Sequence, residues 1–126
     1  MTKEDKDLLL KDLCARLPYS VKIAVQSWDE REWKYIDRVD VLYSVNGDEY
    51  IKSVNEDYEF GLEDIKPYLF PLSSMTVKQR DSYRFLTSPA YTSPVKLINF
   101  FHKNHIDYRG LIEKGLAIDA TNLNIY

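Results

Sequence analysis

Two histidines near the end of the chain stand three residues apart, and an aspartate follows two residues later. His102, His105 and Asp107 are residue types that bind zinc or iron in proteins. However, His102 falls on the apolar side of a predicted helix, and His105 falls at its end, where the helix dipole favours a cation. Asp107 is placed to cap the turn that follows. We therefore predict no metal site and no other cofactor.

Acidic pairs are the second candidate for chemistry, because neighbouring carboxyl groups can serve general acid–base catalysis. Such pairs lie in predicted turns, where nothing indicates a cleft that would shift a pKa; examples are Asp29/Glu30, Asp57/Glu59 and Glu63/Asp64. The sequence contains no glycine-rich phosphate loop, nucleophile elbow or paired CxxC motif. We predict that the protein is not an enzyme.

The second half of the chain mixes cations with aromatic residues, which is typical of proteins that bind single-stranded nucleic acid. The cations are Lys78, Arg80, Arg84, Lys96, Lys103, Arg109 and Lys114, and the aromatic residues are Tyr83, Phe85, Tyr91 and Tyr108. Several of these rings fit a core equally well, and a pI near 5.4 argues against strong non-specific binding.

Residues 107–112 combine a helix cap, an aromatic ring, a cation and an apolar pair. In the structural interpretation, which we favour, Tyr108 anchors this turn to the sheet and Arg109 pairs with the acidic loop around Glu63 and Asp64. In the functional interpretation, Tyr108 and Arg109 form the centre of a contact patch, because both residue types are common in binding hot spots. The binding residues that we predict are Lys103, Tyr108, Arg109, Arg84 and Tyr91.

Length and composition are typical of one cytoplasmic domain. A chain of 126 residues buries roughly two-thirds of its unfolded surface without a disulfide or metal. The single cysteine, Cys14, suits a reducing compartment, and we expect it to pack on the apolar side of the first helix. No signal peptide and no apolar run near the roughly 18 residues of a membrane span is present, so we predict no membrane contact.

Charge is unevenly distributed along the chain, although the net charge is only −3. Residues 1–65 hold 9 Lys/Arg against 16 Asp/Glu, a net charge of −7, whereas residues 66–114 hold 8 against 3, a net charge of +5. This division fits a two-faced molecule that meets an anionic partner with its second half. Two ordinary solvated surfaces would produce the same pattern.

The elements that would position these residues begin with a helix and a sheet. Leucines at helical spacing predict a helix that Thr2 caps and Pro18 ends. Alternating patterns predict three antiparallel strands near residues 20–26, 34–45 and 50–54, joined by a charged turn at Trp28 to Trp33 and by an Asn-Gly turn. In the second strand we expect an inward face of Tyr35, Val39, Val41 and Tyr43.

A segment with two prolines, residues 65–76, separates the strands from the helices. Pro67 and Pro71 exclude an interior helix and a central strand, so we predict a buried, extended connector. Helices should follow at 77–86, behind a capping box of Thr76 and Gln79, and from Ser93-Pro94 to about residue 104. The predicted fold is a single α+β domain with a β-rich half (20–65), the proline segment (65–76), a helical half packed on the sheet (76–115) and a tail (116–126).

Three segments carry a family resemblance: LLLKDLCARLPY, IKPYLFPLSSMT and FHKNHIDYRGLIEKGLAI. They resemble a family of short uncharacterised proteins encoded by anaerobic gut bacteria, often within phages or other mobile elements. Ser20 and Phe70 depart from the glycine and arginine that are frequent there. Because the family has no established activity, the resemblance implies only an accessory role in a mobile genetic context.

We therefore expect a non-catalytic accessory protein whose partner is another protein, bound through exposed tyrosines and the Arg109 region. The alternative is an accessory protein that binds nucleic acid through its basic, aromatic second half.

Overall fold

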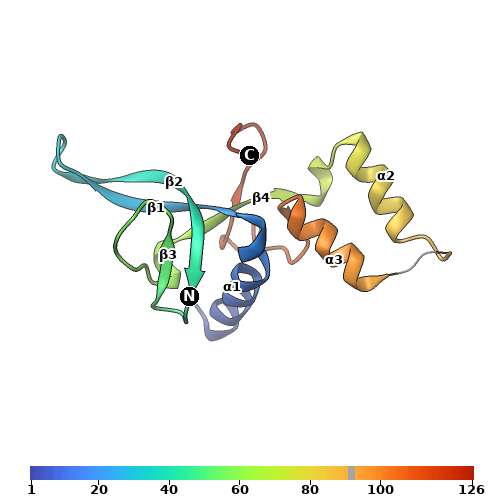
Figure 1. Cartoon of the computed structure of the whole chain (residues 1–126), viewed down its shortest axis with the longest axis horizontal. Helices are drawn as coiled ribbons and strands as arrows, with labels where there is room; N and C mark the ends of the chain where they lie inside the picture. The colour runs from blue at the N-terminus through green and yellow to red at the C-terminus, as the bar shows by residue number, and fades with distance from the viewer. Residues whose placement is uncertain (91–92) are drawn as a thin grey trace.

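Helix α1 (Lys3–Arg16) packs against a mostly antiparallel sheet to form the core (Figure 1). The computed structural model describes residues 1–90 and 93–126. The Thr2 hydroxyl accepts a hydrogen bond from the Asp5 amide at 3.1 Å, which satisfies one of the free amides at the helix start. Leu9 and Leu13, about one turn apart, are fully buried. The predicted α+β fold, the helix and its cap are confirmed.

The sheet has six strands, three of which form the predicted antiparallel meander: β1 (Lys22–Asp29), β2 (Lys34–Val45) and β3 (Ile51–Ser53). Strand β4 (Lys66–Pro71) pairs with β1, and the short strands β5 (Ile106–Asp107) and β6 (Ile118–Asp119) run parallel to β4. Three 3-10 turns, Leu17–Tyr19, Leu62–Asp64 and Leu72–Ser74, connect the larger elements. The last strands therefore complete a sheet that the first half begins.

Strand β4 corrects the prediction that the proline segment cannot be a central strand, because β4 lies between β1 and β5. Each proline occupies a ladder of only two residues: Pro67 lies opposite Ile23, and Pro71 lies opposite Asp107. The missing amides therefore cost few hydrogen bonds. Leu69, between the prolines, is fully buried, so the expectation of an ordered and buried segment is confirmed at its centre.

The inward face of β2 is also different from the prediction. Tyr35, Val39 and Tyr43 are exposed, whereas Asp40 and Leu42 are buried. Side chains alternate along a strand, so an error of one residue turns every side chain to the other face. The buried face includes a carboxylate, Asp40, and a pattern of apolar residues alone does not indicate that a carboxylate points inward.

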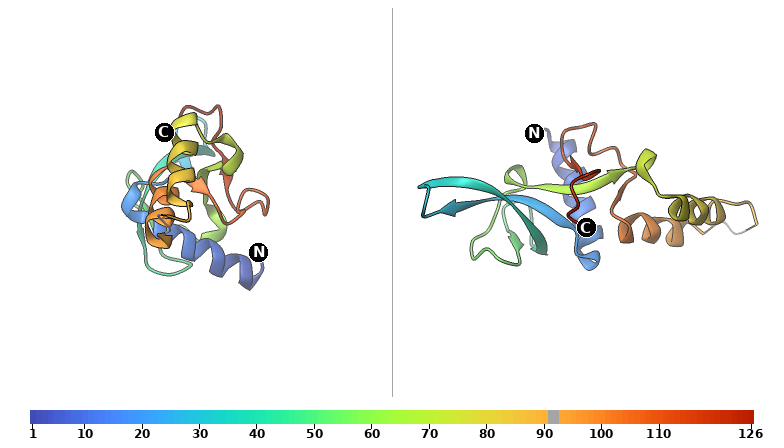
Figure 2. Two further views of the ribbon diagram at one scale, coloured as in Figure 1. Left: turned by 90° about the vertical axis from the view of Figure 1, so that its right-hand side faces the viewer. Right: turned by 90° about the horizontal axis from the view of Figure 1, so that it is seen from above.

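Helices α2 (Val77–Leu86) and α3 (Pro94–Lys103) begin at the predicted caps, including the complete capping box of Thr76 and Gln79. Helix α3 contacts the short strand β5 and helix α1, and α2 packs against α3. They do not cover the sheet as predicted. Instead they extend from one end of the molecule, as Figure 1 and the right-hand view of Figure 2 show. Helix α3 buries Phe101 and His102 among its residues, whereas α2 buries none, because α2 lacks a continuous apolar stripe.

Residues 116–126 are not a free tail. Leu116, Ala117 and Ala120 are buried, and the hydroxyl of Tyr126 donates a hydrogen bond to the carbonyl of Tyr68 at 2.7 Å.

Cys14 is exposed, which contradicts its predicted place on the apolar side of α1. Among the described residues, no helix combines the length and the apolar character needed to cross a bilayer.

Candidate functional site

A buried ionic cluster joins α1 to the turn after α3. Asp12 and Arg16 are fully buried, and the Arg16 Nε donates to the Asp12 carboxylate at 2.8 Å. Arg109 Nε donates to the second Asp12 oxygen at 3.1 Å, and Arg16 also donates to the carbonyl of Ile106 at 2.6 Å. The carboxylate thus pairs with two guanidinium groups, which partly offsets the cost of burying these charges.

Tyr108 lies beside this cluster. Its ring is 4.9 Å from the Arg109 guanidinium and 5.6 Å from that of Arg16, and it stacks on Phe101 at 5.0 Å. The Tyr108 hydroxyl forms a 2.8 Å hydrogen bond with His102 Nε2. Tyr108 therefore already uses its ring in cation–π attraction and its hydroxyl in a hydrogen bond. The cluster therefore links α1 to strand β5 and the turn that follows it.

The predicted pairing of Arg109 with the loop around Glu63 and Asp64 is wrong. Arg109 pairs with Asp12, and Glu63 instead accepts an ion pair from Lys6 at 3.3 Å. The expectation that Tyr108 and Arg109 serve the structure agrees with their contacts. The other predicted binding residues lie elsewhere: Lys103 and Arg84 are exposed on α3 and α2, and Tyr91 lies outside the described residues.

The two histidines and Asp107 are each used separately. His102 contacts Tyr108, His105 stacks on Tyr126 with ring centres 3.9 Å apart, and Asp107 accepts from the amides of Leu111 and Ile112 at 2.9 Å each. Asp107 is therefore a turn cap, as predicted. Within residues 1–90 and 93–126, no group of three or more His, Cys, Asp or Glu side chains is arranged to hold a metal ion.

Burial governs the protonation of both histidines. It lowers the pKa of His105 to about 4, and the nearby charges of Arg16 and Lys22 act in the same direction. Burial and Arg16 also lower the pKa of His102. Both imidazoles are thus neutral near pH 7, which fits stacking and hydrogen bonding inside the molecule.

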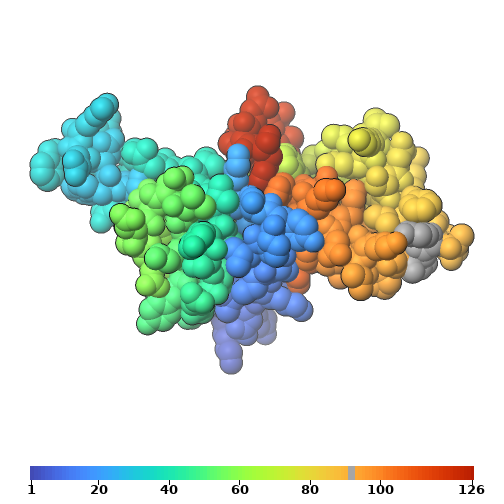
Figure 3. Space-filling view, in the orientation of Figure 1, coloured from blue at the N-terminus to red at the C-terminus, as the bar shows by residue number. Residues whose placement is uncertain are grey.

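Exposed aromatic side chains gather at the opposite end, on the hairpin of β1 and β2. This hairpin projects beyond the rest of the sheet (Figure 3). Trp28, Trp33 and Tyr35 are 43%, 78% and 63% exposed, and we call these three residues the hairpin surface. Trp28 makes edge-to-face contacts with Trp33 at 5.9 Å and with Tyr35 at 5.2 Å. Such contacts hold the rings in a defined arrangement, and more than half of Trp33 and of Tyr35 stays open to solvent.

Local chemistry builds this end of the hairpin. Trp28 and Tyr35 lie directly opposite each other in the ladder of β1 and β2. The Asp29 carboxylate accepts from the Arg31 amide at 2.9 Å, which stabilises the turn. Trp33 has a φ of 52°, in the left-handed region that glycine and asparagine prefer.

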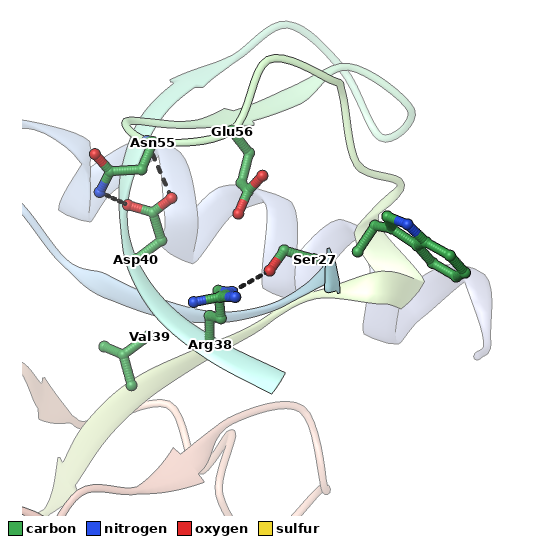
Figure 4. A pocket seen from close by; sticks show the side chains of 7 residues that line it. Ser27, Arg38, Val39, Asp40, Asn55 and Glu56 are labelled. Atoms are coloured by element: carbon green, nitrogen blue, oxygen red, sulfur yellow. Dashed lines mark hydrogen bonds between the residues drawn. The ribbon is translucent and has the colours of Figure 1, made fainter. Parts of the chain in front are cut away.

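An open polar cavity of about 580 Å³ lies along the hairpin, beside the segment around Asn55 (Figure 4). Asp40 accepts hydrogen bonds from the amide and side chain of Asn55 at 3.1 and 2.9 Å. Arg38 donates to the hydroxyl of Ser27, and Glu56 points toward both of them. Trp28 is also part of its wall. The cavity thus places a cation and a carboxylate beside one ring of the hairpin surface.

Asp40 remains ionised in this cavity. Burial alone would raise its pKa, but interactions with Ser53, the Val41 amide and Asn55 together outweigh burial and lower the pKa. A carboxylate with so many donors is a poor general acid.

Acidic residues surround the hairpin surface. The loop 55–59 joins the hairpin through a 2.7 Å hydrogen bond from the Tyr58 hydroxyl to the carbonyl of Gln26. Segments 26–38 and 55–59 together hold seven acidic and three basic residues, a net charge of −4: Asp29, Glu30, Glu32, Asp37, Glu56, Asp57 and Glu59 against Arg31, Lys34 and Arg38. This end therefore complements a basic partner.

The helical end, residues 77–103, has the opposite charge. It holds the five cations Lys78, Arg80, Arg84, Lys96 and Lys103 against one acid, Asp81, a net charge of +4 with His102 neutral. An open groove of about 450 Å³ lies between the helices and is lined by Asp81, Ser82, Phe85, Leu86 and Phe100. The predicted division of charge along the chain therefore becomes a division between the two ends of the molecule.

Sequence reasoning missed the hairpin surface because it interpreted residues 28–33 as a charged turn. A signal was available: two tryptophans and a tyrosine within eight residues, at strand positions beside a turn, are unusual unless they are buried or used in binding.

No protein-family model, curated protein or solved structure matches the chain. Inference about function therefore depends on these side chains.

Proposed function

We propose that the protein is a non-catalytic accessory protein that binds another protein through the hairpin surface. The observation that carries this proposal is the exposure of Trp28, Trp33 and Tyr35 together at a projecting end of the molecule. Tryptophan and tyrosine are the residues most enriched in binding hot spots, because each buries a large area at little cost in conformational entropy.

Two further observations support this proposal. The polar cavity beside Trp28 supplies Arg38 and Glu56, which offer charged contacts at the rim of an aromatic centre. The resemblance to proteins from phages and other mobile elements supports an accessory role in that context. The single cysteine fits a cytoplasmic setting.

A pull-down from host extract tests the proposal. Immobilised wild-type protein should retain a specific partner, and Trp33→Ala should weaken retention at least about tenfold. Tyr43→Ala is the matched control, because Tyr43 is 65% exposed but lies on the part of β2 next to β3. Equal loss with both variants, or no loss with Trp33→Ala, would contradict the proposal.

Nucleic-acid binding is the second candidate function, and the exposed cations of α2 and α3 favour it. The aromatic part of that hypothesis is weaker, because Tyr83 and Tyr108 both contact Phe101 inside the molecule. Labelled single- and double-stranded oligonucleotides at two salt concentrations test it. Salt-sensitive binding that is lost in Lys96→Glu/Lys103→Glu would support this second function, and no binding at low salt would remove it.

A further inference from the structure

We infer that the partner of the hairpin surface is a second copy of the chain, which receives Trp33 in its groove between α2 and α3. This inference rests on the proposed function and names its partner. Trp33 is the most exposed ring of the hairpin surface, at 78%. The groove is open to solvent, and Leu86 and Phe100 form its apolar walls.

Charge complementarity selects a second copy as the occupant. Lys96 and Lys103 stand four residues before and three after Phe100 on α3, so all three lie on one side of the helix. Glu30 and Glu32 lie in the turn next to Trp33. An indole that enters the groove therefore brings carboxylates toward the lysines around it. The net charges of the two ends, −4 and +4, are equal and opposite.

The existing ion pair of Glu32 does not prevent the pairing. Glu32 forms a 3.1 Å ion pair with Lys34, but both side chains are more than half exposed, at 57% and 63%. An exposed pair of this kind contributes little and can exchange partners readily. Asp81 on the groove wall offers a matching contact for Arg31, the one cation inside the turn.

A copy cannot fill its own groove, because the hairpin and the helices lie at opposite ends of the molecule (Figures 1 and 3). Association is therefore head to tail, with the hairpin of one copy in the groove of the next. Such a contact uses two different surfaces, so successive copies form either a closed ring or an open chain. It also weakens as salt screens the charges.

Sedimentation velocity over a range of protein concentrations, at low and high salt, tests this inference. The wild type should self-associate at low salt and less at high salt. Trp33→Ala should weaken association at least about tenfold, and Tyr43→Ala should leave it unchanged. Glu30→Lys/Glu32→Lys and Lys96→Glu/Lys103→Glu should each be monomeric, because each brings like charges together.

Charge reversal also provides a rescue. An equimolar mixture of the two double variants should associate again, because the basic hairpin of one meets the acidic groove of the other. A single chain with all four substitutions should also self-associate. Circular dichroism checks that each variant is folded, which is expected because all four positions are exposed.

Three outcomes overturn the inference: a wild type that is monomeric at every concentration, association that is indifferent to Trp33→Ala, or a mixture that stays monomeric. Failure of the proposed function is distinguishable. A monomeric wild type that captures a different protein through Trp33 upholds the function and overturns self-association. A monomer that binds oligonucleotides through Lys96 and Lys103 overturns self-association and favours the second candidate function.

Discussion

The buried ionic cluster and the hairpin surface use similar residue types for opposite purposes. In the cluster, Arg109 pairs with Asp12, and Tyr108 stacks on Phe101. These groups are therefore already engaged inside the molecule. In the hairpin surface, Trp28 and Trp33 contact each other, and both side chains are exposed, at 43% and 78%. The difference teaches that residue type indicates a capacity for binding, whereas burial and existing partners decide whether that capacity is free.

Removal of Asp12 should cause the largest loss of stability, and it tests whether the buried ionic cluster serves the structure. Asp12→Ala leaves two guanidinium groups without their carboxylate, one of them on the fully buried Arg16. We expect a loss of about 3–5 kcal/mol in the free energy of unfolding, the usual cost of an uncompensated buried charge. Urea denaturation of both proteins measures this loss.

The exposed pair of Lys6 and Glu63 is the matched control for that experiment. Its atoms are 3.3 Å apart, but the Glu63 side chain is 58% exposed. Glu63→Gln should change stability by no more than about 0.5 kcal/mol. If the two substitutions had equal effects, the cluster would not be the structural centre that its burial indicates.

Acid should weaken the region around His105, with an intermediate effect. The pKa of His105 is lowered to about 4 in the folded protein, from 6.5 in the unfolded chain. Between these values the unfolded chain binds more protons, so stability is full above pH 6.5 and falls as pH drops toward 4. Because His105 is only half-buried and solvent screens its charge, the loss between pH 7 and pH 5 should be below about 2 kcal/mol.

His105→Asn tests this assignment, because asparagine tolerates the φ of 57° at this position. The variant should show a shallower decline in stability between pH 7 and pH 5, with a remainder from His102. Asp40 does not confuse the measurement, because its lowered pKa affects stability only below its ordinary value of 3.8. An unchanged pH profile would show that another group titrates.

Truncation of Tyr35 should cause the smallest loss of stability, and it tests whether the hairpin surface contributes little to the fold. Tyr35→Ala removes the ring opposite Trp28, whose centre lies 5.2 Å away. We expect a loss of about 1 kcal/mol, as for other aromatic pairs. Thermal unfolding measures this loss, and the near-ultraviolet circular dichroism of the tryptophans should weaken. A loss as large as that of Asp12→Ala would mean that the hairpin belongs to the core.

Local features of the fold could be predicted from sequence because their partners are close in the chain. The caps formed by Thr2 and by Thr76 with Gln79 depend on residues three positions apart. The Asn46-Gly47 turn likewise predicts the pairing of β2 with β3. Features that depend on distant partners were harder: the prolines of β4 are tolerated only because of where its short ladders end.

The same reasoning applies to the sites. Arg109 and its carboxylate partner Asp12 are 97 positions apart, so sequence indicated a role for the cation but not its partner. The exposure of Tyr35 follows from the inward position of Asp40, which depends on Asn55 fifteen residues later. Only the tertiary structure reveals which tyrosines and tryptophans remain outside.

The backbone at Trp33 has a consequence for how this protein can change. A φ of 52° costs a residue with a side chain roughly 1–2 kcal/mol that glycine would not lose. Glycine at this position would therefore give a more stable hairpin that lacks the most exposed ring of the hairpin surface. The indole at this position therefore lowers stability in exchange for partner binding, and selection for thermal stability alone would be expected to remove it.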